Sequence, residues 1–281
     1  MIRRGRSAFV LSAGVIAALL AACGPGAQAT SSEPSSPSAS AGGAGPVNLS
    51  VYAAASLKGV VEDAATAFEA ANPGTAVTVS ADSSTALEMQ IEQGAPADVF
   101  LSADTANPQK LVDAGLALRT AAIFASNKLV IVVPKDNPGG LTTARDLDRS
   151  GLRIIAAGDE VPITTYANQV VANIASKYGP NGLVEVYHAH IVSKEDNVKA
   201  VIAKIVLGEG DAAIVYVSDA KASTKVATVA IPDDANVPAT YAGVVVKASP
   251  NRDAAQAFLD WFAGPAGQAI LATYGFLPPP A

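Results

Sequence analysis

Two strand-like runs early in the chain each end in a cluster of hydroxyl residues just before a helical segment. The run Val51–Leu57 contains Ser56, and the run Val77–Thr85 contains Ser83. The first turn of a helix leaves its backbone N–H groups without intrahelical partners and carries about half a positive charge, so an oxyanion placed there meets both donors and a favourable dipole. Serine hydroxyls can donate to the same ligand. The two turns therefore predict an anion-binding site.

Two later helix starts have the same character. Pro162 stands where a first helical turn tolerates proline, which leaves the amide of Ile163 free to point at a ligand. Asn197 is placed to cap a helix whose first amide is that of Val198. An apolar strand further on ends in the phenol of Tyr216, and ligands of open α/β sheets collect at strand ends. Any one of these turns alone is explained by ordinary helix capping, so a binding site requires several of them to converge.

Residues 1–22 have the pattern of a lipoprotein signal peptide. Three arginines (Arg3, Arg4 and Arg6) precede an apolar stretch and a run of small residues that ends at Cys23, the chain's only cysteine. Lipidation at Cys23 would anchor an exported protein to the outer face of the cell membrane. The alternative is an ordinary secretory peptide with an incidental cysteine, and Sec and twin-arginine export both stay open.

The segment that follows the signal peptide is rich in Ser, Ala, Gly and Pro. Residues 23–46 are therefore expected to form the lipidated cysteine and a flexible tether, with the globular part beginning at Val47. A single cysteine allows no internal disulfide and no thiolate metal site. The fold must then be held by packing alone.

The charge balance argues against nucleic acid as a partner. Without the three signal arginines the chain keeps 16 basic against 25 acidic residues, a net charge of −9. No basic run or aromatic-basic face is present to neutralise phosphates. An acidic protein can still bind a small dianion when fixed backbone dipoles supply the local field.

Apolar runs of strand length alternate with segments of helical period, which predicts an α/β fold with mostly parallel sheets. Strands are expected near 48–53, 76–80, 97–101, 127–133, 153–157, 184–190, 212–217, 226–231 and 241–247. Helices are expected near 57–71, 85–93, 105–113, 162–177, 198–208, 251–263 and 266–273. No internal repeat is visible in the sequence.

After the second hydroxyl turn the chain reads LEMQIEQGAPADVFLSAD over Leu87–Asp104, and here it resembles the molybdate-binding proteins of bacterial ABC importers. The match continues through Val161-Pro162, Asp196–Val198, Gly210–Tyr216, Ser218–Ala220 and Gly264–Phe276, and so covers nearly all of the mature domain. The resemblance implies a two-lobed periplasmic-binding-protein-like (type II) fold with a hinge. Lobe 1 would comprise 47–127 and 234–281, and lobe 2 would comprise 128–233.

The resemblance also implies the site and the function. A tetrahedral oxyanion, molybdate and with it tungstate, would be held by hydroxyls, amides and a phenol, all neutral; the residues are Ser56, Ser83, Ile163, Val198 and Tyr216. The protein would be a monomer without cofactor or catalysis that delivers its ligand to a membrane permease. Thr164 and Asn197 depart from the family pattern, which often has glycine and an acid there, and Thr164 would either crowd the entrance or add a hydroxyl. Asp82, beside Ser83, is expected to face solvent.

Other functions fit the residues less well. A receptor for sulfate or another tetrahedral oxyanion is the nearest alternative, and a ferric-ion receptor would need Tyr166, Tyr216 and Tyr241 to converge as phenolates. An exported α/β hydrolase is a further alternative, but Ser218 to Lys221 matches Ser-x-x-Lys without its companion motifs.

Two pairs of residues could be taken for a metal site or a catalytic pair, but simpler roles account for both. His188 and His190 would share one face of a strand, yet two ligands do not make a metal site, so a solvated strand edge is the expectation. Asp98 and Asp104 are explained by turn and capping roles rather than by acid–base catalysis.

Overall fold

The computed structural model describes residues 46–179 and 181–280. The signal peptide expected at 1–22, Cys23 and nearly all of the tether lie outside these residues. Within the described part of the chain no helix is both long enough and apolar enough to cross a membrane.

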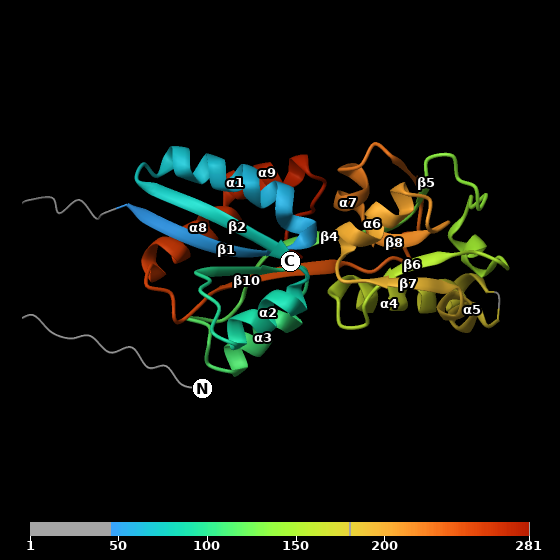
Figure 1. Cartoon of the computed structure of the whole chain (residues 1–281), viewed down its shortest axis with the longest axis horizontal. Helices are drawn as coiled ribbons and strands as arrows, with labels where there is room; N and C mark the ends of the chain where they lie inside the picture. Colours follow the sequence, from blue (N-terminus) through green and yellow to red (C-terminus); the bar gives the residue numbers. More distant parts are fainter. Residues whose placement is uncertain (1–45, 180, 281) are drawn as a thin grey trace, which may run out of the picture. The chain divides into compact units, whose positions relative to one another are not determined.

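The first sheet has five strands and defines what we call lobe 1. In spatial order they are β2 (Thr75–Asp82), β1 (Val47–Ala54), β3 (Val99–Ser102), β10 (Ala239–Val245) and β4 (Ala122–Asn127). The lobe 1 helices are α1 (Lys58–Ala71), α2 (Ser84–Glu92), α3 (Ala106–Asp113), α8 (Arg252–Ala263) and α9 (Pro265–Thr273). Figure 1 shows α1 and α9 on one side of this sheet and α2 and α3 on the other.

The lobe 1 sheet is covered by helices on both faces, as its apolar strands predict. Along β3, Val99 and Leu101 face a core that includes Phe68 of α1, while Phe100 faces a second core formed with α2 and α3. Phe68 meets Phe258 of α8 edge to face, with ring centroids 5.2 Å apart. The C-terminal helices therefore pack back onto the first lobe, as the resemblance implies.

The remaining strands define lobe 2. They are β7 (Ile191–Glu195) paired with β6 (Ile154–Ala157), and β8 (Ala213–Tyr216) paired with β5 (Leu129–Pro134), which also pairs with β9 (Val226–Val229). A parallel bridge between Ile154 and Ala212 joins the two groups. The lobe 2 helices are α4 (Pro162–Tyr178), α5 (Leu183–Ala189), α6 (Val198–Val206) and α7 (Val217–Lys221). Short 3-10 turns lie in both lobes: η1 (Ala55–Leu57) in lobe 1 and η2 (Ala144–Asp148) in lobe 2.

The two lobes have the same strand order. Lobe 1 reads β2-β1-β3-β10-β4, and with the Ile154–Ala212 bridge lobe 2 reads β7-β6-β8-β5-β9. In each lobe the fourth strand arrives from the other lobe, since β5 follows β4 and β10 follows β9 along the chain. The α/β two-lobed class is confirmed, while the exact lobe boundaries stay a prediction.

The expectation of mostly parallel sheets needs correction. The pairs β1–β2, β1–β3 and β6–β7 are parallel, but β10 and β5 are antiparallel to both of their neighbours. The reason is topological: a strand that crosses from one lobe enters the next sheet from the opposite end. Alternating helices and strands predict parallel pairing only where each crossover stays within one sheet.

The strand expected at 184–190 is wrong, because this segment is helix α5. Gly182, with a positive φ of 88°, precedes the helix, and Leu183 and Tyr187 are its buried residues. A spacing of four residues places both on one helical face. Val184 and Val186, both β-branched, suggested a strand.

Candidate functional site

Four strand-to-helix turns, two from each lobe, meet at one pocket. They follow β1, β2, β6 and β7, the corresponding strands of the two sheets. The pocket encloses about 210 Å³ of empty space including its mouth. All five residues expected to bind an oxyanion line it: Ser56, Ser83, Ile163, Val198 and Tyr216. The structure thus brings the whole predicted set together, and their role in binding stays a prediction.

The lobe 1 side of the pocket presents two buried serines. Ser56 lies in η1, is 7% exposed, and its Oγ is 3.3 Å from the hydroxyl of Tyr241. Ser83 caps α2, where its Oγ accepts the N–H of Ala86 at 3.2 Å. Because that bond uses an acceptor position of the hydroxyl, the Ser83 proton remains available to a ligand.

The backbone N–H of Ser83 is already hydrogen-bonded to the carboxylate of Asp82. Its Oδ1 accepts the Ser83 N–H at 2.7 Å and also the side-chain N–H of Asn197 at 3.1 Å. The expectation that Asp82 faces solvent is therefore wrong, because the side chain is half-buried and bonded on the pocket side of β2. Ser83 is left to offer a ligand its hydroxyl rather than its amide.

The lobe 2 side presents the starts of α4 and α6. Pro162 has no N–H, so Ile163 supplies the first free amide of α4. Asn197 Oδ1 accepts the amides of Lys199 and Ala200, both at 3.1 Å, and this leaves the Val198 N–H without a partner among the described residues. Unpaired amides at two helix starts form the arrangement that favours an anion.

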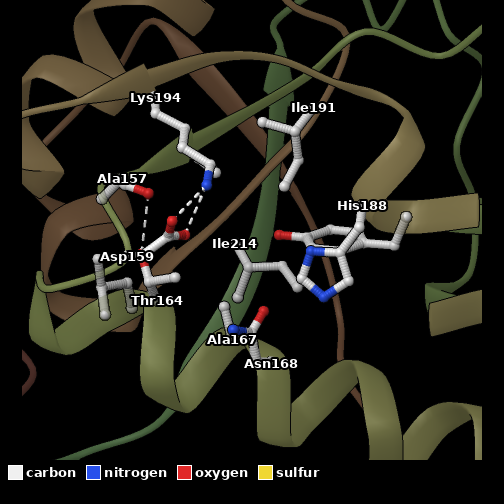
Figure 2. Close-up of a pocket in the computed structure, with 12 residues that line it drawn as sticks. Ala157, Asp159, Thr164, Ala167, Asn168, His188, Ile191, Lys194 and Ile214 are labelled. Carbon is white, nitrogen blue, oxygen red and sulfur yellow. Dashed lines mark hydrogen bonds and ion pairs between the residues drawn. The ribbon is translucent and has the colours of Figure 1, made fainter. Parts of the chain in front are cut away.

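Thr164 does not enter the pocket. Its hydroxyl donates to the backbone oxygen of Ala157 at 3.0 Å, as Figure 2 shows, on the side of α4 that faces a separate lobe 2 pocket. In the same view Lys194 pairs with Asp159 at 2.6 Å. Thr164 therefore neither crowds the oxyanion pocket nor adds a donor to it.

Tyr216 ends β8 with its phenol buried. The residue is 1% exposed, and its hydroxyl has no hydrogen-bond partner among the described residues. Burial, followed by the nearby Tyr241, raises the pKa of Tyr216 well above its usual value. The phenol is thus a neutral donor that lacks an acceptor. A buried hydroxyl without a hydrogen-bond partner destabilises the fold, and a ligand that accepts this hydrogen bond would remove the penalty.

A charged pair that sequence reasoning missed lies beside this phenol. Asp219 in α7 is 1% exposed, and its Oδ1 is 2.7 Å from Nζ of Lys199 in the first turn of α6. Burial raises the pKa of Asp219, and the ammonium of Lys199 opposes that rise. The pair brings no net charge to the pocket. Nothing in the local sequence distinguishes Asp219 from a surface acid.

The structure assigns simpler roles to several other candidates. His188 lies in α5 and His190 caps its end, so they do not share a strand face, and no cluster of three potential metal-ligating residues of the His, Cys, Asp and Glu types occurs in the described chain. Ser218 accepts from Asn127, and Lys221 donates to the backbone oxygen of Thr273, so they do not act as a hydrolase pair.

The expected turn and capping roles of the two aspartates are confirmed. Asp98 accepts the Ser50 amide at 2.7 Å, and Asp104 accepts the Asn107 amide at 3.0 Å. Both carboxylates are therefore committed to backbone groups and do not form a catalytic pair.

Replacing either pocket serine with alanine is expected to weaken oxyanion binding by about 1.5–3 kcal/mol, the worth of a hydrogen bond to a charged group. Ser83→Ala also removes a helix cap and should lower the free energy of unfolding by about 1 kcal/mol. Calorimetry and thermal unfolding measure the two effects. His188→Ala, which lies in the other pocket, is the control. Wild-type affinity in both serine variants would place the ligand elsewhere.

A family model, curated relatives and a solved structure all match this chain over most of its length. Residues 49–277 match the family described as bacterial extracellular solute-binding protein. The molybdate-binding protein ModA of Mycobacterium tuberculosis is 36% identical over 270 residues, which cover 96% of this chain and 98% of that protein. ModA of Escherichia coli is 32% identical over 236 residues, covering 81% and 88%. The solved periplasmic molybdate-binding protein of Azotobacter vinelandii has a TM-score of 0.72 at 28% identity, with 83% of this chain and all of that chain covered.

Proposed function

The chain belongs to the bacterial extracellular solute-binding proteins, and within them to the molybdate-binding proteins, and from this premise we propose that it captures molybdate between its two lobes and delivers it to the permease of an ABC importer. It is a binding protein and not an enzyme. Tungstate, a tetrahedral dianion of the same charge, is proposed as a second ligand. The pocket is complete within one chain, and we therefore propose that the protein works as a monomer.

The observation that carries the proposal is the buried, unpartnered phenol of Tyr216. Its hydroxyl lacks an acceptor among the residues that the structure describes, and within the same residues the amides of Ile163 and Val198 in this pocket are also unpaired. The five free donors of the pocket, each worth about 1.5–3 kcal/mol in a hydrogen bond to a charged ligand, would provide on the order of 7–15 kcal/mol before association costs. Micromolar to nanomolar affinity is therefore reachable without a lysine in the pocket.

A ferric-ion receptor is less well supported. Tyr166, Tyr216 and Tyr241 do cluster, with ring centroids 6.3 and 5.6 Å apart along the series. Burial raises the pKa of Tyr166 to about 12 and raises the pKa values of Tyr216 and Tyr241 well above their usual value, so phenolates are disfavoured. The Tyr166 hydroxyl accepts the backbone amide of Thr240, and the Tyr241 hydroxyl pairs with Ser56. These hydroxyls are committed within the protein.

Tyr216→Phe tests the function with effects of opposite sign. Removing an unpartnered buried hydroxyl should leave the unliganded protein as stable as the wild type or more so, since a desolvated donor is lost and the packing is kept. The same change should weaken molybdate binding by about 1–2 kcal/mol, because one donor to the oxyanion is gone. Thermal unfolding with and without molybdate, together with calorimetry, measures both. A destabilised unliganded variant with unchanged affinity would contradict the proposed role of the phenol.

We also propose that Cys23 is lipidated and holds the protein on the outer face of the cell membrane after export. The support is the sequence pattern around the chain's only cysteine. Cys23→Ser is expected to move the protein from the membrane fraction to the soluble extracellular fraction, because one residue carries the anchor. Fractionation with immunoblotting measures the distribution. Membrane association that survives the change would refute lipidation at this position.

A further inference from the structure

A short hydrogen-bonded chain crosses from lobe 1 to lobe 2 beside the pocket. Asp82, the last residue of β2, accepts the Ser83 N–H at 2.7 Å and the Asn197 side-chain N–H at 3.1 Å through the same Oδ1. Asn197 in turn accepts the amides of Lys199 and Ala200 with its own oxygen. Two half-buried side chains therefore link the start of α2 to the start of α6.

These two helix starts carry opposite parts of the oxyanion site. The α2 side presents the hydroxyl of Ser83, and the α6 side presents the amide of Val198. The bond between Asp82 and Asn197 can form only when the lobes approach each other at the pocket. A contact made only in one conformation stabilises that conformation and raises the affinity of any ligand that requires it.

We propose that Asp82 and Asn197 form a clasp that holds the lobes together over the bound oxyanion and slows its release. The inference rests on the proposed function. Neither residue needs to touch the ligand through its side chain for this role, so both are positioning residues. A second contact between lobes, from the Thr85 hydroxyl to the Glu160 backbone oxygen at 2.7 Å, shares the task. Loss of the clasp should weaken binding without abolishing it.

The chemistry of the clasp requires one acid and one amide. Asparagine at 197 caps α6 with its oxygen and donates to Asp82 with its nitrogen. Aspartate at 197 would cap the helix equally well, but it has no proton to donate and would place two carboxylates face to face. Asn197→Asp is therefore a near-isosteric change that preserves the fold and turns an attractive contact with Asp82 into a repulsive one.

The test compares four variants with the wild type by calorimetry and by stopped-flow release of molybdate. Asn197→Asp should weaken binding by about 10- to 100-fold, mainly through faster release. Asp82→Asn keeps an acceptor and should lose less. The double variant Asp82→Asn with Asn197→Asp restores an amide facing an acid and should regain affinity to within about threefold of the wild type. Asp196→Asn, which removes an exposed acid next to the clasp, is the matched control for the loss of a negative charge in Asp82→Asn.

Salt provides an independent readout. The deficit of Asn197→Asp should shrink as ionic strength rises, since screening weakens repulsion between partly exposed charges. Wild-type affinity in Asn197→Asp, or a double variant as weak as Asn197→Asp, would overturn the clasp alone. Failure of the wild type to bind molybdate would overturn the proposed function and the clasp with it.

Discussion

A Val198→Pro variant is expected to fold like the wild type and to bind molybdate at least about 100-fold more weakly. Val198 is the first residue of α6, a position that tolerates proline because its N–H has no intrahelical partner. Asn197 already has the extended conformation that precedes proline, with φ −160° and ψ 169°. The substitution therefore removes one of the two amides proposed to face the oxyanion and leaves the helix in place.

The size of the effect has two causes. A hydrogen bond to a charged ligand is lost, worth about 1.5–3 kcal/mol, or about 10- to 150-fold in affinity. The proline ring also puts carbon where the N–H pointed, so the ligand oxygen must move away. Calorimetry measures the affinity, and thermal unfolding of the unliganded variant should show a loss of no more than about 1–2 kcal/mol from the smaller buried side chain.

Val198→Ala is the matched control. It keeps the amide and removes buried methyl groups from a side chain that is 4% exposed, so it should lose stability and retain affinity. The two variants thus separate the backbone of residue 198 from its side chain. A proline variant that binds as well as the alanine variant would show that the α6 amide is not a ligand donor.

The turns that form the pocket could be located from the sequence because each is a local feature. Pro162 at the start of a helix and Asn197 before another are cap signals that depend on a few neighbouring residues. Their convergence was not local. It follows from two sheets with one strand order, which places the turns after β1 and β2 opposite those after β6 and β7. The sequence carries no visible repeat, so the family resemblance had to supply this step.

The structure differs from the sequence-based predictions where contacts between distant residues determine the local conformation. Segment 184–190 contains β-branched residues but buries Leu183 and Tyr187 on one face, and packing made it a helix. The sequence suggests solvent exposure for Asp82 because its bond to Asn197, 115 residues away, leaves no local signal. Strand direction was misjudged for β5 and β10 because each crosses between lobes. None of these partners is marked in the local sequence.

Phosphate is expected to bind about 10- to 100-fold or more weakly than molybdate at neutral pH, while sulfate competes only weakly for a different reason. Phosphate keeps at least one proton near neutrality and so brings a donor into a pocket whose free groups are donors. An oxyanion can accept a hydrogen bond from each of five donors, which are the hydroxyls of Ser56, Ser83 and Tyr216 and two backbone amides. A buried O–H without an acceptor costs about 1–3 kcal/mol. Sulfate has no proton and fails only because it is smaller, which stretches some of the hydrogen bonds.

The carboxylate of Asp82, next to the pocket serine Ser83, is a group that could rescue phosphate by accepting its proton. It does not line the pocket, and its Oδ1 already accepts from Ser83 and Asn197. Turning it inward would break the bond between the lobes and bring a negative charge toward a dianion. Competition titrations of phosphate and sulfate against bound molybdate measure the discrimination, with tungstate as the ligand expected to displace molybdate. Phosphate binding as tight as molybdate binding would mean that an acceptor faces the ligand, and both the donor-lined pocket and the molybdate assignment would then fail.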